Sequence, residues 1–263
     1  MAVVTLMSAS GSPGVTSTAL GMAVCWPRPV VLVEADPTGG SSVLAGFFRG
    51  EVASSRGLID LALAHRSGAL ADAVATNVIP IQGSTVMLLA GVRNHAQSRS
   101  LVDVWEPLLA VLRGLERTGQ DVIVDAGRLG MTNSPDALIY GSDLTLFTTR
   151  TNLPSLAGAR SWANTLHDAF ERRGALQQLR TLLIGKGRPY GPAEVAKVLQ
   201  IPVAATVPWE PEMAEVFSNG AHKPRKFDSA SLVRGIRATC AAAEGAIAAN
   251  RAELGTAETG ARA

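Results

Sequence analysis

A glycine-containing loop near the amino terminus is the first group of residues in this sequence that is suited to chemistry. The loop reads Gly11-Ser12-Pro13-Gly14-Val15-Thr16-Ser17-Thr18. In a phosphate-binding loop of the form G-x-x-x-x-G-K-[ST], backbone N–H groups surround the phosphates, the lysine contacts the β- and γ-phosphates, and the hydroxyl ligates Mg²⁺. Gly11 and Thr18 match the ends of that pattern, but Thr16 and Ser17 replace its second glycine and its lysine. Alone, the loop is as consistent with a simple turn as with a nucleotide site.

Two acidic segments follow apolar runs in the manner of strand-end carboxylates. Asp125 closes the run 122–124, and Glu34-Ala35-Asp36-Pro37 follows the run 30–33. A carboxylate at the end of a hydrophobic strand is where a Walker B aspartate holds Mg²⁺ through water. With the Thr18 hydroxyl, Asp36 and Asp125 are therefore the candidate Mg²⁺ ligands. Three strand-end motifs in this order are more specific than the loop alone.

Short apolar runs alternate with helical stretches along the chain, which is typical of a parallel sheet covered on both faces. Strands are predicted at residues 3–7, 30–33, 85–89, 121–124, 144–148, 181–184 and 203–207. Helices are predicted at residues 16–24, 58–65, 98–118, 153–173, 191–200, 211–218 and 229–250. We expect one α/β domain over residues 1–254, with a mostly parallel sheet and helices on both faces, followed by a flexible tail over 255–263.

The predicted topology would bring the candidate residues together. Ligands of open parallel sheets bind at the carboxyl ends of the strands. The segments 11–18, 34–37, 125–130 and 150–153 are therefore expected along one edge of the sheet. A dinucleotide-binding oxidoreductase is disfavoured, because residues 11–14 do not form G-x-G-x-x-G.

Composition narrows the class of protein. Hydrophobic residues make up 47% and charged residues 17% of the chain, which permits a sizeable core and is not typical of disorder. A net charge of +2 excludes a histone-like polycation. Two cysteines are too few for a disulfide framework, and the four histidines show no metal-ligand spacing. With no signal-peptide pattern and no apolar run of about 18–20 residues, we expect a cytoplasmic protein without an integral membrane segment.

Several segments together resemble the MinD/ParA family of P-loop ATPases, whose Walker A loop is deviant. The resemblance is carried by residues 11–24, 30–40, 121–130, 142–162 and 201–220. It implies a P-loop fold, binding of ATP and Mg²⁺, and a homodimer that closes around ATP. Members of the family use this cycle to position plasmids, chromosomes, division proteins, pili and flagella.

The resemblance also assigns roles to individual residues. Asp36 matches the family's catalytic, water-positioning aspartate, and Asp125 matches the switch II aspartate, with Gly127 or Gly130 as the switch glycine. Pro208 and Trp209 match the loop that flanks the adenine.

Other family residues are lost in this chain. Both lysines of the family's loop are missing, because they fall on Ser12 and Ser17, and the adenine-contacting asparagine falls near Gly185. Three cations in predicted strand-end loops are candidate replacements for the lysines: Arg128, Arg150 and Lys186.

These losses predict a degenerate member of the family. Phosphoryl transfer depends on charge stabilisation and positioning, so loss of both lysines predicts weak or absent ATP hydrolysis. Members with eroded loops resemble the TadZ/CpaE group, which implies a localisation or scaffold factor for a pilus or secretion machine, peripheral at the membrane through a partner. The alternative is an ATP-cycling partition ATPase that contacts DNA non-specifically through Lys223, Arg225 and Lys226. The sequence is also compatible with a slow but genuine ATPase and with a protein of this fold that binds no nucleotide.

Overall fold

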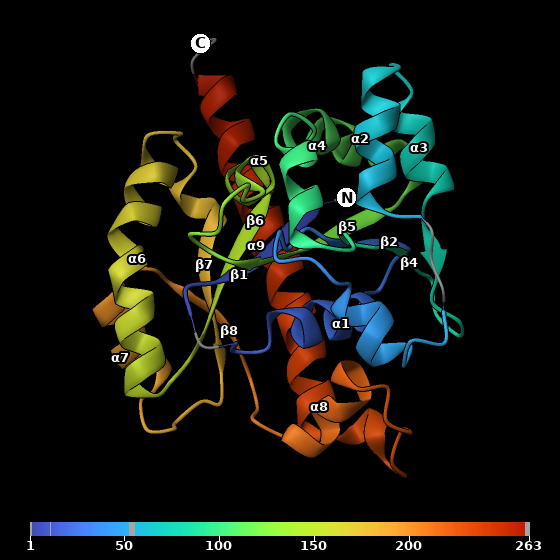
Figure 1. Cartoon of the computed structure of the whole chain (residues 1–263). Helices are drawn as coiled ribbons and strands as arrows, with labels where there is room; N and C mark the ends of the chain where they lie inside the picture. The colour runs from blue at the N-terminus through green and yellow to red at the C-terminus, as the bar shows by residue number, and fades with distance from the viewer. Residues whose placement is uncertain (1, 11, 53–55, 261–263) are drawn as a thin grey trace.

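The computed structural model describes residues 2–10, 12–52 and 56–260, and a single eight-stranded sheet organises them (Figure 1). Its strand order is β3-β4-β2-β5-β1-β6-β7-β8. The strands are β1 (Val3–Ser8), β2 (Val30–Glu34), β3 (Ile79–Pro80), β4 (Val86–Leu89), β5 (Asp121–Arg128), β6 (Leu144–Arg150), β7 (Leu179–Ile184) and β8 (Val203–Val207). All neighbouring pairs are parallel except β3 with β4, which are antiparallel at one edge.

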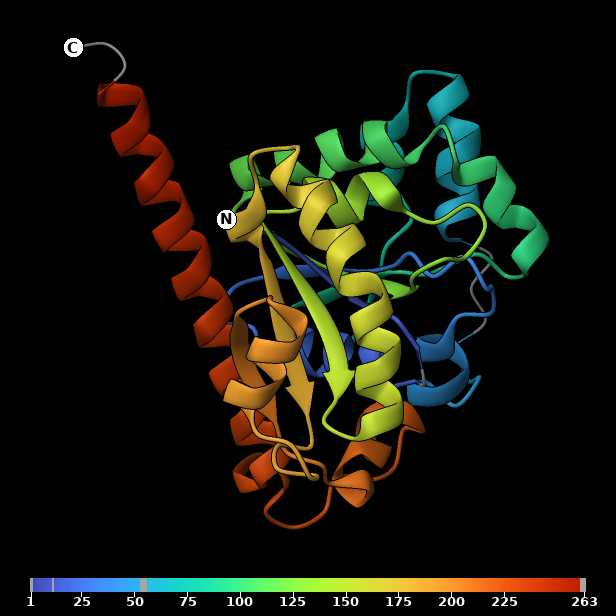
Figure 2. The ribbon, with the colours of Figure 1, turned by 90° about the vertical axis from the view of Figure 1, so that its left-hand side faces the viewer.

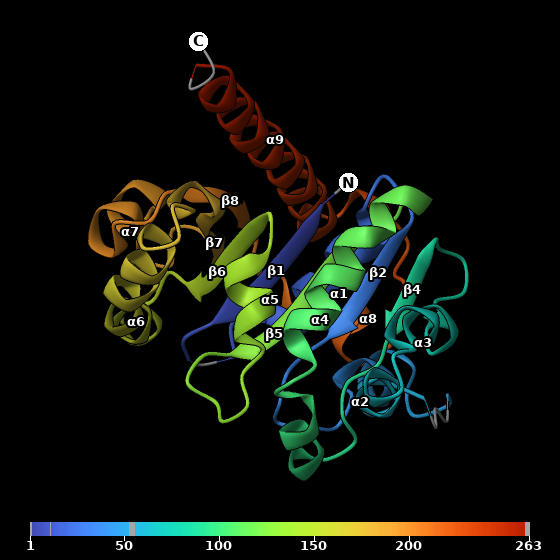
Figure 3. The ribbon, with the colours of Figure 1, turned by 90° about the horizontal axis from the view of Figure 1, so that it is seen from above.

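Nine α-helices are assigned in the described part of the chain, and they divide between the two faces of the sheet. They are α1 (Val15–Cys25), α2 (Leu58–Arg66), α3 (Leu70–Thr76), α4 (Trp105–Gly114), α5 (Asp136–Gly141), α6 (Leu153–Glu171), α7 (Pro192–Leu199), α8 (Pro211–Ser218) and α9 (Ser231–Gly260). One buried apolar cluster joins the sheet to α2–α7, and a second joins it to α1, α8 and α9. Figure 3 shows α4 and α5 lying over the strands, on the face opposite α1.

The continuous apolar runs explain the central strands. Every residue of β1 and β2 is buried, which is the pattern of strands covered on both faces. Successive side chains point to opposite faces, so Val4 and Leu6 enter the cluster under α1 while Val3 and Met7 enter the other. The mostly parallel sheet with helices on both faces, predicted from the sequence, is therefore confirmed.

The predicted helix over residues 98–118 is wrong as one continuous element. The chain instead forms a 3₁₀ segment at His95–Leu101, then α4, then a second 3₁₀ segment at Leu115–Thr118. Pro107 explains the break, because proline is tolerated only in the first turn of a helix, and α4 begins two residues before it. The short elements α3, α5 and β3 were not predicted, since none spans enough residues to show a hydrophobic period.

The last helix is longer than predicted. Helix α9 begins at Ser231 and continues to Gly260, ten residues past the predicted end at Asn250. The predicted domain boundary at residue 254 therefore falls inside a helix, and residues 261–263 lie outside the described part. Figure 2 shows α9 running along the sheet and then extending past it. Among the described helices, none is both long and apolar enough to cross a membrane.

Candidate functional site

The loop that follows β1 lies at the carboxyl edge of the sheet, as predicted. Gly11 lies outside the described residues. Ser12 (φ 46°) and Gly14 (φ 99°) both have left-handed backbone conformations, which the glycine adopts without a steric penalty. Gly14 is the N-cap of α1, and its carbonyl accepts a hydrogen bond from Thr18 N at 2.9 Å. The N-terminus of α1, with its free N–H groups, therefore lies at this edge, and such a position favours anions.

Two cavities border this loop. The first, here called the loop cavity, has a volume of about 380 Å³. It is lined by Ser8, Ser12, Gly14, Val15, Thr16, Ser17, Asp36, Ser42, Gly127, Arg128, Phe217 and Ser218. It brings the loop from β1, the acid after β2 and the glycine of β5 into one hollow. Pro13 is buried and borders the other cavity instead.

The second hollow, here called the tryptophan cavity, has a volume of about 210 Å³ and shares Gly14 and Ser17 with the loop cavity. Its lining includes Pro13, Gly14, Ser17, Thr18, Arg150, Pro208 and Trp209. The structure thus brings the predicted adenine-flanking pair beside the loop. Gly185, where the family's asparagine was expected, packs on Trp209, since a Cβ on this glycine would lie 3.3 Å from Trp209 Cβ.

Asp125 is buried at the end of β5, where its side chain is 2% exposed. Gly127 N donates a hydrogen bond to Asp125 Oδ1 at 3.0 Å, and the Thr16 side chain lies near this carboxyl group. Burial raises the pKa of Asp125 to about 7; the Thr16 side chain and Gly127 N oppose this shift, and the charges of Glu34 and Asp36 add to it.

Thr16 therefore has a role that the loop pattern did not reveal. The residue that replaces the second glycine of the pattern lies near the strand-end aspartate and favours its charged form. The sequence did contain a signal, namely a hydroxyl residue in the first turn of a helix that faces a predicted strand-end carboxylate.

Asp36 lines the loop cavity beside Gly127. Its Oδ1 accepts hydrogen bonds from Thr38 N at 2.9 Å and from Thr38 Oγ1 at 2.7 Å, which hold the turn after β2. Gly127 has φ 65°, and a Cβ on it would overlap the Asp36 carboxylate. This contact explains why a glycine stands at position 127. The other candidate switch glycine, Gly130, packs instead against Trp162.

Glu34, the first acid of the segment after β2, is engaged by its own neighbours. It is 5% exposed and accepts hydrogen bonds from Ser41 Oγ, from Val43 N at 3.0 Å and from Gly91 N at 3.3 Å. Burial raises the pKa of this carboxyl group, although the three donors favour its charged form. Glu34 therefore anchors the following loop to the end of β4.

The donor set suits a hard cation. Three carboxyl groups (Glu34, Asp36 and Asp125) interact electrostatically here, and hydroxyls from the loop lie beside them. Mg²⁺ prefers oxygen ligands of this kind and retains several waters, so the site needs only one or two carboxylates. Of the predicted ligands, Asp36 reaches the loop cavity, Thr18 borders the tryptophan cavity, and Asp125 lies behind Thr16.

The three candidate replacements for the lost lysines are placed differently. Arg150 ends β6 and donates from Nη2 to Ser12 O at 3.1 Å. Arg128 lines the loop cavity, but it is exposed and its Nη2 lies 3.5 Å from Met131 Sδ. Lys186 is exposed and borders neither cavity. Only Arg150, of these three, makes a polar contact with the described loop.

A basic loop lies between α8 and α9. Lys223, Arg225 and Lys226 are all exposed there. Lys223 Nζ lies 5.8 Å from the centre of the Phe227 ring, and Asp228 forms an ion pair with Arg237 at 3.9 Å. The loop thus offers solvated cations without a cavity of its own among the described pockets.

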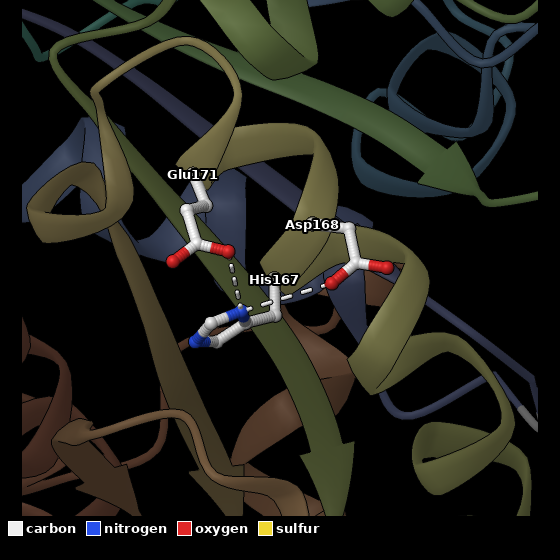
Figure 4. Close-up of side chains that lie close together, drawn as sticks. All are labelled: His167, Asp168 and Glu171. Atoms are coloured by element: carbon white, nitrogen blue, oxygen red, sulfur yellow. Dashed lines mark ion pairs between the residues drawn. The ribbon is translucent and has the colours of Figure 1, made fainter.

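A second polar cluster lies on α6, away from the loop. His167 Nδ1 is 4.0 Å from Asp168 Oδ1 and 3.9 Å from Glu171 Oε2, as Figure 4 shows. The four histidines show no metal-ligand spacing among themselves, but residues 167 and 171 share one helix face and so bring carboxylates beside His167. The two acidic side chains are 61% and 66% exposed, which makes this a solvated surface cluster.

Comparison with known proteins identifies the fold. No protein-family model matches this sequence, and no curated protein matches it at a significant level. Among solved structures, the chain is similar to the septum site-determining protein MinD of Pyrococcus horikoshii OT3 complexed with Mg-ADP. The two sequences are 16% identical, the match covers 90% of this chain and 93% of that one, and the TM-score is 0.67. A ParA-family ATPase of Chlorobium tepidum TLS is 16% identical over 91% and 98% of the two chains, with a TM-score of 0.69.

The MinC:MinD cell division protein complex of Aquifex aeolicus matches as well. It is 15% identical over 93% of this chain and 96% of that one, with a TM-score of 0.70. The likeness extends over nearly the whole chain in each case, so it concerns the complete sheet and both helical layers. The chain therefore has the P-loop NTPase fold of the MinD and ParA proteins.

Proposed function

We propose that this chain is a degenerate, nucleotide-binding positioning protein of the MinD/ParA type with weak or absent ATP hydrolysis. In this proposal it acts in the cytoplasm as a localisation or scaffold factor for a cell-envelope machine, such as a pilus or secretion system in the manner of the TadZ/CpaE group, and reaches the membrane through a partner.

The charge of the site carries this proposal. Serines stand at both lysine positions, Ser12 and Ser17, whereas Asp36 lines the same cavity and interacts electrostatically with the buried Asp125. Phosphoryl transfer requires positive charge around the transferred group, and each missing cationic contact is worth several kcal/mol at most. A site with acids and without the loop lysines can hold Mg²⁺, but it lacks the cations that rapid turnover requires.

The remaining features support nucleotide binding. The loop from Gly11 to Thr18 would hold the phosphates through its N–H groups, and Pro208 and Trp209 would flank the base in the tryptophan cavity. Mg²⁺, which would neutralise phosphate charge when bound, would be held by Thr18 with Asp36 and Asp125. Asp36, held by Thr38, would position a water in the loop cavity. The MinD of Pyrococcus horikoshii is complexed with Mg-ADP, which supports this assignment.

The proposed assembly is a homodimer that engages a protein partner. The MinD of Aquifex aeolicus is solved as a complex with MinC, which supports a protein partner for a chain of this fold. A scaffold is expected to dimerise or bind its partner with or without nucleotide, whereas a cycling ATPase is expected to depend on ATP.

Calorimetric titration with ATP and Mg²⁺ tests the binding part of the proposal. Micromolar affinity is expected for the wild type, with loss of affinity in Thr18→Ala and Asp125→Ala. Hydrolysis is then expected to be slow, and size-exclusion with light scattering should show the same oligomer with and without ATP. Absence of binding at millimolar ATP would overturn the nucleotide-binding proposal.

An ATP-cycling partition ATPase is the second candidate, and the exposed basic loop favours it. Neutralising Lys223, Arg225 and Lys226 should then weaken binding to non-specific DNA and reduce its salt dependence. Rapid hydrolysis that is lost in Asp36→Ala, together with ATP-dependent dimerisation, would favour this function over the scaffold.

A further inference from the structure

Arg150 lies between the phosphate-binding loop and the tryptophan that borders its cavity. Its Nη2 donates to Ser12 O at 3.1 Å, and its guanidinium carbon lies 4.2 Å from the centre of the Trp209 ring. The same side chain lines the tryptophan cavity with Gly14 and Ser17. One cation therefore touches both segments proposed to hold a nucleotide.

The local backbone fixes the position from which Arg150 extends. Arg150 pairs with Ile184 in the register of β6 and β7. The next residue, Thr151, is 1% exposed; its hydroxyl donates to Gly185 O at 2.6 Å and accepts from Arg188 N at 3.1 Å. The side chain thus begins at the end of a paired strand, and a buried hydroxyl ties the chain after it to the neighbouring loop.

The hydrogen-bonding capacity of Arg150 is not used up. Its Nε is buried and has no hydrogen-bond partner in the described part of the chain. No carboxylate among the described residues forms an ion pair with it, although Glu210 and Glu215 line the same cavity. A buried donor without a partner is unfavourable, and such a group in a native structure is commonly satisfied by a ligand or water.

An anion with several oxygens fits these unused donors. The Nε and Nη groups of arginine form a planar fork that matches phosphate, and a cation so placed gains more from an anion than from the carbonyl and ring that it now contacts. The first turn of α1 borders the same cavity through Ser17 and Thr18, and this end of a helix also favours anions.

We propose that Arg150 provides, within the same chain, the cationic phosphate contact that Ser12 and Ser17 lack. The ligand class is a nucleoside polyphosphate, and the inference rests on the proposed nucleotide-binding function. Trp209 holds the guanidinium in position by stacking, and Ser12 O holds one of its N–H groups.

Calorimetry with Mg-ATP on three variants tests the assignment. Arg150→Gln should weaken ATP binding about 10- to 100-fold, since a hydrogen bond to a charged group contributes about 1.5–3 kcal/mol. Arg150→Lys keeps the charge without the planar fork, so its ATP affinity should lie between those of the wild type and Arg150→Gln. Lys186→Gln removes one charge from the neighbouring loop, borders neither cavity, and should bind as the wild type does. Thermal melts establish that the variants are folded.

Tripolyphosphate, which has no base, should compete with ATP and lose the same factor in Arg150→Gln. A loss confined to ATP would show that Arg150 acts on the base through Trp209, and would overturn the assignment. Equal ATP affinity in wild type and Arg150→Gln, or equal losses in Arg150→Gln and Lys186→Gln, would also overturn it while leaving the nucleotide site intact. A wild type that binds no ATP would overturn the proposed function and this inference together.

Discussion

The Asp36 carboxylate lies directly against the α-carbon of Gly127, so two strand ends that line the loop cavity are in contact. A side chain at position 127 would displace the carboxylate or the backbone of β5. Asp36 and Gly127 therefore behave as one unit, although they lie 91 positions apart in the sequence.

Gly127→Ala should destabilise the protein and displace Asp36. The backbone at position 127 has φ 65°, a conformation that is unfavourable by about 1–2 kcal/mol for a residue with a Cβ, and the overlap with Asp36 adds to this. Urea unfolding measures the loss. Gly83→Ala is the matched control, because Gly83 has φ 73° and nothing within 4 Å of its Cβ position. Equal losses in both variants would show that the Asp36 contact contributes nothing.

Ser17→Lys should strengthen ATP binding. Ser17 borders both cavities and stands at the lysine position of the phosphate-binding pattern, so the added ammonium would reach bound phosphate. The expected gain is about 10-fold or more by calorimetry, from one charge-assisted contact. Ser67→Lys adds the same charge at an exposed position outside both cavities and should have no effect. A Ser17→Lys protein with unchanged affinity would argue against a phosphate-binding role for the loop.

Asp121→Ala should destabilise the fold while leaving ligand binding by the folded protein intact. Asp121 is fully buried at the start of β5 and accepts from Ala2 N at 2.6 Å, Trp26 Nε1 at 2.7 Å and Arg28 Nε at 2.7 Å. The variant leaves the buried Ala2 N and Trp26 Nε1 donors without a partner, and each such donor costs about 1–3 kcal/mol, which chemical denaturation would detect.

Asp143→Ala is the control for that variant. Asp143 also accepts a hydrogen bond from the first strand, from Val3 N at 2.8 Å, but its side chain is 28% exposed. Water can therefore replace part of what is lost, and the destabilisation should be smaller. A loss as large as that of Asp121→Ala would contradict the importance of burial.

Glu210→Gln should destabilise the protein at neutral pH but not in acid. Glu210 accepts hydrogen bonds from Ser231 Oγ and from Leu232 N at 2.7 Å, where α9 begins, and these bonds lower the pKa of its carboxyl group. A lowered pKa in the folded state means that the stabilisation is present above the ordinary glutamate pKa of about 4.3 and is lost as pH falls through the lowered value.

Unfolding free energies of wild type and Glu210→Gln, measured at several pH values, should therefore converge in acid. The exposed Glu51 provides the comparison, and Glu51→Gln should show no such convergence. A gap between wild type and Glu210→Gln that persists in acid would mean that packing, rather than the charge, holds the start of α9.

The sequence alone determined seven of the eight strands of the described sheet and the candidate loop. Continuous apolar runs such as 30–33 and 122–124 are buried on both faces, and local hydrophobicity is enough to reveal them. The candidate phosphate-binding loop was recognisable for a related reason, because Gly14 and the hydroxyls around it occur within a few residues of one another. Short elements such as α3 and α5 were not predicted, since helices of seven and six residues are too short to show a hydrophobic period.

Tertiary structure alone decided which side chains meet at the site. Arg128, Arg150 and Lys186 were equivalent candidates by topology, and only packing placed Arg150 between Ser12 and Trp209. The pairing of Thr16 with Asp125 depends likewise on segments more than a hundred residues apart. Such contacts are set by strand order and by the length and rotamer of each side chain, which local sequence patterns do not encode.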